Sequence, residues 1–415
     1  MTPRGVVPSE DTSRAAPPQG DAGRAWTLLA LLACAELLGM SPWFTGSAAA
    51  PELVARWALS EAQVGGLSTA VQLGFVLGTA LSAVLNLADV IPARRYFTYA
   101  AVAAAAANGA LLWAPEYPTA LVTRALTGLC MAGVYPPAMK TAATWFRARR
   151  GLAVGTVVGA LTVGKAMPYL WRVLPEASLE LIVLSASAAA VVAALGIALL
   201  WRDGPFAFPS RPFSWGLVGE VVGAPRWRLA TGGYLGHMAE LYAYWTWIPA
   251  FVAASSVAWA GDPAAARAPW VGALSFGTIA VGGVGCLWGG LVSDRVGRER
   301  LVILAMAASG LCALLIGLVF GRSPLLLAPL ALAWGFFVIA DSAQFSVLVT
   351  ESVPAHAVGT ALTVQVCLGF LLTTLTIQLV PIVVGIVGWP GAFAMLAIGP
   401  ALGILSIRRL QARRA

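Results

Sequence analysis

The chain has 415 residues, of which 59% are hydrophobic and only 11% are charged, and its mean hydropathy is +0.81. Because a soluble domain carries roughly 25% charged residues, this composition excludes a water-soluble globular protein and predicts a chain that lies in a bilayer. The net charge of +8 does not indicate nucleic-acid binding, since the arginines stand in short groups between apolar runs, where they act as topology signals.

The first 24 residues are polar, rich in proline and glycine, and carry acidic residues as well as arginine. A cleavable signal peptide would instead begin with a short basic region and a short apolar core. Residues 1–24 are therefore expected to form a disordered cytoplasmic tail ahead of the first transmembrane helix.

Twelve apolar runs of suitable length follow, because an α-helix needs about 20 residues to cross roughly 30 Å. Residues 25–201 are expected to form an N-terminal six-helix bundle, 228–408 a C-terminal one, and 409–415 a cytoplasmic tail. Between the bundles, the proline-rich segment 202–227 is expected to be a cytoplasmic linker with a short interfacial helix around 216–222. The twelve expected spans are 25–49, 63–88, 96–114, 118–146, 150–171, 177–201, 228–254, 269–292, 300–320, 323–349, 355–383 and 387–407.

The basic residues determine the expected orientation. With both termini inside, 19 of the basic residues outside the spans fall on the cytoplasmic side and 4 on the other. This bias predicts a multi-pass inner-membrane protein with both termini in the cytoplasm. The five cysteines all lie in apolar runs without paired spacing, which predicts buried, reduced thiols rather than a disulfide or metal framework.

The two halves of the chain repeat short sequence matches at one offset of 204 residues. Matches in corresponding places favour two halves related by an axis along the membrane normal. The matching pairs are 35–37 with 239–241 (Ala-Glu-Leu), 153–156 with 357–360 (Ala-Val-Gly-Thr), and Arg94 with Arg298.

The loop after the eighth run reads GLVSDRVGRER, residues 290–300. It resembles the G-x-L-a-D-r-x-G-R-r signature of the major facilitator superfamily, and the twelve runs, the linker and the repeat extend the resemblance over nearly the whole chain. The resemblance implies an all-α membrane protein, with twelve transmembrane helices in two pseudo-symmetric six-helix bundles, that works by alternating access.

A cytoplasmic gate is expected at this loop and at its degraded copy in the first half, where Leu85 replaces the first glycine. The bland alternative is an arginine-rich topology loop with an incidental aspartate. The expected gate residues are Gly290, Asp294, Arg295, Gly297 and Arg298, with Asp89 and Arg94 from the first copy.

Two further segments resemble superfamily motifs. Residues 124–128, RALTG, are similar to an R-x-x-x-G motif whose arginine is associated with proton coupling in drug/proton antiporters; the alternative is an arginine that snorkels to the interface. Residues 155–164, GTVVGALTVG, match the spacing of the antiporter signature g-x-x-x-G-P-x-x-G-G, but Ala160 and Val163 depart from it. Helix packing through small residues is therefore the favoured interpretation of this segment.

Six charged residues lie well inside the expected spans, away from the span ends, where a charge costs about 2.5–3.5 kcal/mol on insertion scales and marks a polar interior. The resemblance implies that they surround a central cavity, because every one lies on an expected cavity-lining helix or on the 150–171 helix between the halves. Lys140 and Asp341, at similar depths, are expected to pair in an inward-closed state. The six are Glu36, Arg124, Lys140, Lys165, Glu240 and Asp341, and the two lysines are the only lysines in the chain.

Uncharged and aromatic residues complete the expected site. Tyr244 and Trp247 share a helix face with Glu240 at i, i+4 and i+7, which predicts an aromatic wall beside the acid. Trp247 could alternatively belong to an interfacial aromatic belt. His237 stands one turn before Glu240, and Tyr135 and Gln365 are expected to be polar groups of the cavity.

We predict a monomeric, proton-coupled transporter of a small organic or inorganic anion. Lys140, with Lys165 or Arg124, would contact the anion, and Glu36 or Glu240 would carry the proton. The alternative is proton-antiport efflux of a cationic or amphipathic compound recognised by the acids and aromatics, since three cations and three anions leave the sign of the substrate open. A non-transporting membrane sensor is less favoured. The sequence has no nucleotide loop, paired metal motif or activated nucleophile, so neither an enzyme, a cofactor nor a nucleic-acid partner is expected.

Overall fold

The computed structural model describes residues 19–146, 150–174, 177–205 and 214–413. Within these ranges every regular element is a helix. Residues 1–18 of the expected disordered tail lie outside the described residues. Residues 19–24 already belong to the first helix, α1 (Gln19–Gly39), because a helix can continue past the apolar layer when its polar residues face water.

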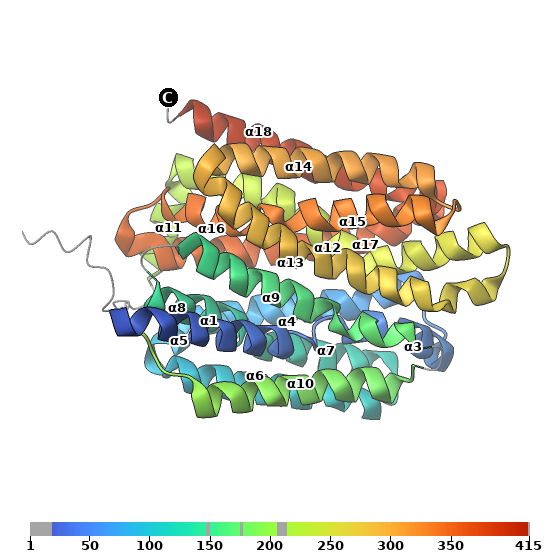
Figure 1. Ribbon diagram of the computed structural model, residues 1–415, viewed down its shortest axis with the longest axis horizontal. Coiled ribbons are helices and arrows are strands. Elements are labelled where there is room, and N and C mark those ends of the chain that lie inside the picture. The colour runs from blue at the N-terminus through green and yellow to red at the C-terminus, as the bar shows by residue number, and fades with distance from the viewer. Residues whose placement is uncertain (1–18, 147–149, 175–176, 206–213, 414–415) are drawn as a thin grey trace, which may run out of the picture.

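The helices of the two halves run along the long axis of the molecule, and Figure 1 shows the first half, blue to green, below the second, yellow to red. The first half contains α1, α2 (Thr45–Ala48), α3 (Ala50–Trp57), α4 (Glu61–Val84), α5 (Leu87–Val90), α6 (Ala93–Gly109), η1 (Ala110–Trp113), α7 (Tyr117–Met131), α8 (Tyr135–Trp145), α9 (Arg150–Leu170), η2 (Trp171–Val173) and α10 (Leu179–Leu200). The linker helix α11 (Trp215–Gly223) precedes the second half. That half contains α12 (Pro225–Ala260), η3 (Pro263–Arg267), α13 (Pro269–Val296), α14 (Arg298–Leu315), η4 (Ile316–Val319), α15 (Pro324–Ala340), α16 (Ser342–Thr350), η5 (Ala355–Ala357), α17 (Val358–Ala392), η6 (Phe393–Ala397) and α18 (Ile398–Ala412).

Seven helical segments of the described chain are long and apolar enough to cross a membrane by length and composition. They correspond to eight of the expected spans, with ends that differ by a few residues, since the last segment, Ala355–Ala412, covers two of them. The other four expected spans are not among these segments. Those at 25–49, 96–114 and 118–146 are each divided into shorter helices, and the span at 228–254 lies in α12, which is long enough to cross a membrane but less apolar.

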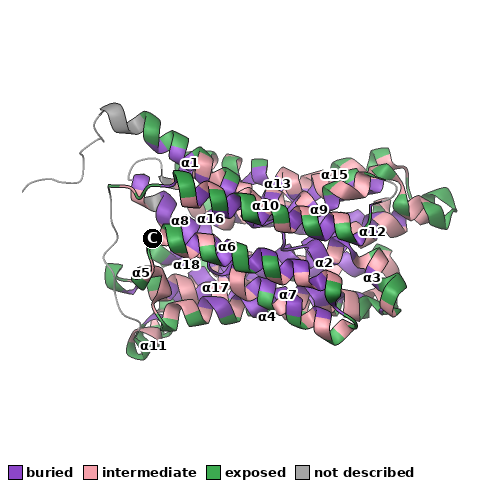
Figure 2. Cartoon of the chain, turned by 90° about the horizontal axis from the view of Figure 1, so that it is seen from below, coloured by how far each residue is buried: buried purple, intermediate pink, exposed green. Residues whose placement is uncertain are grey.

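Large apolar side chains are exposed on the outward faces of the molecule, where Figure 2 shows exposed and half-buried residues along the helices. On α10 they include Leu184, Leu195 and Leu199, and on α14 Leu304 and Leu311. A soluble monomer rarely exposes so much contiguous apolar surface. These faces are therefore the ones that contact lipid.

Three of the helices nearest the centre are discontinuous. The first ends at Gly39, α7 and α8 are separated by residues 132–134, and Asp341 separates α15 from α16. Pro136 and Pro137 lie in the first turn of α8, where their missing N–H groups cost nothing but do not allow α7 to continue. Broken helices free backbone groups that a membrane protein must satisfy internally, and in transporters such breaks mark the substrate site.

The two halves meet most extensively where α9 packs along α13 and α4 packs along α17. Small residues allow the first contact, because a Cβ atom on Gly159 would lie 2.9 Å from the carbonyl oxygen of Gly283. In the second contact, the side chain of Gln378 on α17 lies 3.0 Å from the hydroxyl of Thr69 on α4. The segment 155–164 thus packs helices together through its glycines.

We expect Gly164→Ala to destabilise the protein far more than Gly155→Ala. A Cβ atom on Gly164 would lie 2.1 Å from the carbonyl oxygen of Leu37 on α1, whereas one on Gly155 would lie 3.2 Å from that of Cys286. Forcing backbones apart costs about 1–3 kcal/mol of unfolding free energy. Thermal unfolding of the two purified variants in detergent measures the difference, and equal melting temperatures would contradict the tight contact between α1 and α9.

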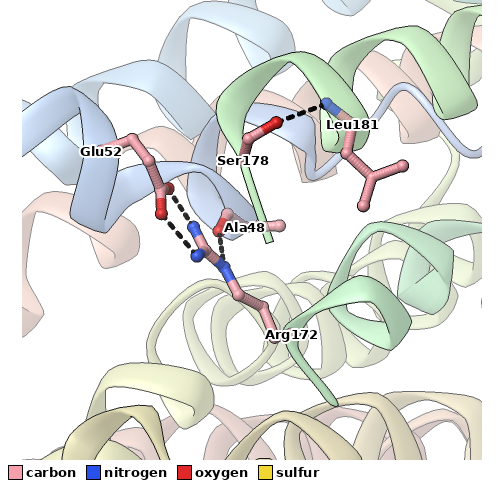
Figure 3. Close-up of polar contacts among 5 residues, drawn as sticks. All are labelled: Ala48, Glu52, Arg172, Ser178 and Leu181. Carbon is pink, nitrogen blue, oxygen red and sulfur yellow. Dashed lines mark hydrogen bonds and ion pairs between the residues drawn. The ribbon is translucent and has the colours of Figure 1, made fainter. Parts of the chain in front are cut away.

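Arginine 172 fastens the short helices at the end of the molecule opposite the two termini. Figure 3 shows its guanidinium against the carboxylate of Glu52 on α3, with Nη1 donating to Oε1 at 2.7 Å and Nε donating to the carbonyl oxygen of Ala48 at 2.6 Å. Beside it, the hydroxyl of Ser178 accepts a hydrogen bond from the N–H of Leu181 at 3.1 Å and so caps α10. The contact fixes α3 to η2, which follows the C-terminal end of α9.

Candidate functional site

A cavity of about 40 Å³ lies between the two halves, among α8, α9, α12, the broken α15–α16 pair and α17. Tyr135 and Gln365, both expected at the cavity, are among its lining residues. None of the described residues that line it is charged. The aromatic and uncharged polar members are Tyr135, Tyr234, Tyr242, Trp245, Phe370, Ser342, Ser346 and Gln365, and the others are aliphatic.

Lys165, on α9, is surrounded by aromatic rings next to this cavity. Its Nζ is hydrogen-bonded to the hydroxyl of Tyr242. The same atom lies 3.8 Å from the ring centroid of Trp43, 4.6 Å from that of Tyr242, 5.5 Å from that of Trp245 and 6.0 Å from that of Phe370. These distances are within the range at which a ring face attracts a cation. We call these four aromatic residues the ring cage.

Glu36, on α1, is the carboxylate with which the ammonium of Lys165 interacts electrostatically. Its side chain is fully buried, and neither carboxylate oxygen has a hydrogen-bond partner among the described residues. The carboxylate and the ammonium of Lys165 interact electrostatically without a direct hydrogen bond. A buried carboxylate without hydrogen bonds is costly, so this group is well suited to gain and lose a proton.

Glu240 occupies the corresponding place in the sequence repeat but has different surroundings. Its Oε2 accepts a hydrogen bond from the hydroxyl of Ser309 and its Oε1 accepts one from Nε1 of Trp334, both at 2.8 Å. These partners lie on α14 and α15, so the carboxylate faces the interior of the second half and does not line the cavity. Of the two repeat glutamates, Glu240 has hydrogen-bond partners and Glu36 has none within the part of the chain that the structure describes.

Arg124, on α7, is fully buried and braces the break after α1. Its Nη1 donates to Oδ1 of Asn108 at 2.7 Å, and its Nη2 donates to the carbonyl oxygens of Pro42 at 2.8 Å and Trp43 at 2.6 Å. These carbonyls are among the backbone groups that the helix break frees. Arg124 therefore does not snorkel to an interface; it positions Trp43 of the ring cage.

Asp341 is paired differently from the expectation. Its Oδ1 lies 2.9 Å from Nδ1 of His237, and both side chains are buried. Lys140 donates instead to the carbonyl oxygen of Ala88 at 3.1 Å, within the first half. The Lys140–Asp341 pair is not formed in this conformation, because each side chain reaches a partner in its own half. Its formation in an inward-closed state stays a prediction.

The expected aromatic wall faces away from the cavity. Tyr244 donates to the carbonyl oxygen of Ala331 at 3.0 Å, and Nε1 of Trp247 donates to that of Ile377 at 2.9 Å. The wall of α12 that does face the cavity carries residues spaced at i, i+4, i+8 and i+11, a spacing that also marks one helix face. They are Tyr234, Met238, Tyr242 and Trp245.

The expected gate contains an ion pair between Arg298 and Glu351. Nη1 of Arg298 lies 2.5 Å from Oε1 of Glu351 at the end of α16, whereas Asp294 and Arg295 are exposed. Gly297 ends α13 with φ +90°, and a Cβ atom on Gly290 would contact Gly151 of α9. In the first-half copy, Arg94 donates to the carbonyl oxygen of Ala198, and the side chain of Asp89 lies outside what the structure describes. The role of Asp294 in gating stays a prediction.

Comparison with known families identifies the protein class. The family model described as Major Facilitator Superfamily matches residues 31–376. The chain belongs to the major facilitator superfamily. The sequence-based prediction of the family and of its two-bundle fold is thereby confirmed. No curated protein matches the chain.

Solved structures share the fold of this superfamily transporter. One is the crystal structure of a bacterial homolog of the human lysosomal transporter Spinster in an inward-facing, unoccupied conformation; it is 14% identical, with a TM-score of 0.68, and 96% of this chain and 99% of that chain are covered. The inward-facing, occupied conformation of such a homolog is 15% identical, with a TM-score of 0.64 and coverage of 94% and 95%. At these identities the similarity shows the fold alone.

Proposed function

We propose that this transporter moves an amphipathic organic anion together with a proton. The observation that carries the proposal is the position of Tyr242, whose ring lines the cavity and whose hydroxyl is hydrogen-bonded to Lys165. Lys165, the positive member of the buried Glu36–Lys165 pair, is thereby linked to the cavity through this hydroxyl, and the hydroxyl can donate a hydrogen bond to an anion in the cavity.

We further propose that the transporter is a monomer in the inner membrane with both termini in the cytoplasm, as the arginine distribution predicts.

The lining of the cavity supports an organic solute rather than a small inorganic ion. Its walls are aromatic and aliphatic, with a few hydroxyl and amide groups that would orient a ligand. The other buried cation among the described residues, Arg124, has its two Nη groups engaged by Asn108 and by backbone carbonyls, and it does not line the cavity. Lys165 is therefore the cation that we assign to the solute's charge.

The position of Glu36 supports coupling to a proton. Its carboxylate and the solute anion would compete for the one ammonium of Lys165, so protonation of Glu36 favours binding of the anion. By linkage, the bound anion favours protonation of Glu36 to the same degree. Proton and anion therefore bind together, which makes the transporter a symporter.

Uptake into proteoliposomes tests this function. Purified transporter is reconstituted, an inwardly directed proton gradient is imposed, and labelled arylcarboxylates, alkylammonium compounds and neutral aromatics are compared. We expect saturable accumulation of an arylcarboxylate that collapses when the gradient is dissipated. Proton-driven movement of the alkylammonium compounds alone would support the cation-efflux alternative instead, and the absence of counterflow for every solute would favour a sensor.

We expect Tyr242→Phe to raise the KM for the anion roughly tenfold with a smaller change in kcat. The variant removes the hydroxyl that links Lys165 to the cavity, and a hydrogen bond to a charged group contributes about 1.5 kcal/mol, close to one factor of ten. Tyr244→Phe is the matched control, because its hydroxyl donates to the carbonyl of Ala331 instead. Initial uptake rates over a range of anion concentrations measure both variants, and an equal rise in KM would contradict the link.

A further inference from the structure

The ring cage has the construction of a binding site for an organic cation. Four ring centroids lie within 6.0 Å of the Nζ of Lys165, and all four aromatic residues are buried. The rings also contact one another, with centroid distances of 5.8 Å between Trp43 and Tyr242, 5.2 Å between Tyr242 and Trp245, and 5.0 Å between Tyr242 and Phe370. Proteins recognise quaternary ammonium groups with such cages, since each ring presents its negative face to the charge.

The cage is continuous with the cavity. Tyr242, Trp245 and Phe370 belong to both, whereas Lys165 is not among the residues that line the cavity. A solute in the cavity therefore touches three of the four rings, and the ammonium of Lys165 already lies within 6.0 Å of the same three rings. Trp43 comes from the first half and the other three rings from α12 and α17 in the second, so the cage is complete only where the halves meet.

We propose that the ring cage is an organic-cation site whose occupant is the transporter's own Lys165, and that this tethered ammonium excludes organic cations from the cavity. A solute ammonium that reached the rings would meet a like charge a few ångströms away in a site with little water. The tether also gives Lys165 a high effective concentration, against which a free cation competes poorly. Lys165 thereby determines that the cavity accepts anions rather than organic cations. This inference rests on the proposed anion transport.

Removal of the tethered ammonium tests the assignment. Lys165→Ala is purified in detergent and titrated with tetramethylammonium, and separately with n-butylammonium, by calorimetry and tryptophan fluorescence. We expect saturable binding of both cations to the variant, at least roughly tenfold tighter than to the wild-type protein. Lys140→Ala, which removes the other lysine, is expected to behave like the wild type. Lys165→Ala combined with Trp43→Ala is expected to lose the binding, because Trp43 is the nearest ring.

The outcomes separate the cage from the proposed function. A folded Lys165→Ala protein without saturable cation binding overturns the cage assignment, even if the wild type transports anions. Equal binding of tetramethylammonium by the wild type overturns it as well. Cation binding by the variant, together with a wild type that transports no anion, supports the cage and overturns the proposed anion transport. If Lys165→Ala does not purify as a monodisperse protein, Lys165→Ser is titrated in the same way and judged by the same outcomes.

Discussion

Glu36→Gln is expected to abolish proton-driven accumulation of the solute while exchange of the solute across the membrane continues. Glutamine keeps the shape of the side chain but cannot carry the proton, and it no longer competes for the ammonium of Lys165. A gradient of one pH unit is worth 1.36 kcal/mol, or about tenfold accumulation in a one-proton symporter. In the variant the internal concentration should rise only to the external one. Uptake and counterflow in the same proteoliposomes measure the two activities separately.

Glu240→Gln is the matched control, because the two glutamates stand at the same place of the sequence repeat. The carboxylate of Glu240 holds Ser309 and Trp334, so we expect its replacement to lower the melting temperature and to leave the accumulation ratio unchanged. The opposite pattern, with accumulation lost only in the Glu240 variant, would reassign the proton to Glu240.

Arg124→Leu is expected to cost roughly 3 kcal/mol of unfolding free energy. It leaves Oδ1 of Asn108 and the carbonyl oxygen of Trp43 without a donor among the described residues, and it removes one of the two donors to the carbonyl oxygen of Pro42. Arg124→Lys should recover only part of this stability, since an ammonium lacks the fork that spans all three oxygens. Thermal unfolding measures the cost. Arg172→Gln is the control, since the partly exposed pair with Glu52 contributes less than about 1 kcal/mol.

The Arg124 variants also distinguish a structural role of this arginine from a role in proton coupling. If Arg124 only stabilises the chain after the end of α1, the fraction of Arg124→Lys protein that folds should still accumulate solute when a proton gradient is imposed. A variant that unfolds at the wild-type temperature yet loses proton coupling would instead support the role that the superfamily motif implies for this arginine. Tryptophan fluorescence would additionally report a displaced Trp43.

The apolar runs, the arginine distribution and the loop at 290–300 were sufficient to predict the family, the all-helical fold and the two-fold repeat. These properties follow from local physics: an apolar run of about 20 residues is unstable outside the bilayer, and ionised side chains are costly within it. The same cost identified Glu36, Arg124 and Lys165 as candidates for the interior, and all three are buried.

The helix faces could not be chosen from the sequence. On α12 the spacing of Glu240, Tyr244 and Trp247 and that of Tyr234, Met238 and Tyr242 both describe a single face. Either could have pointed at the cavity, since rotating a helix by about half a turn exchanges the two. The contact of Glu240 and Tyr244 with α14 and α15 places the second set at the cavity.

The roles of the buried charges likewise depend on helices that are remote in the chain. Glu36 and Glu240 share the tripeptide Ala-Glu-Leu, yet Ser309 and Trp334 satisfy only Glu240. Sequence patterning therefore establishes which charges are buried, because the cost of placing a charge in an apolar run is a property of the run itself. Packing between α1, α9, α12 and α17 determines that Lys165 contacts the ring cage and that Glu36 has no hydrogen bond among the described residues. The reason is that the rotation and separation of whole helices decide which side chains meet.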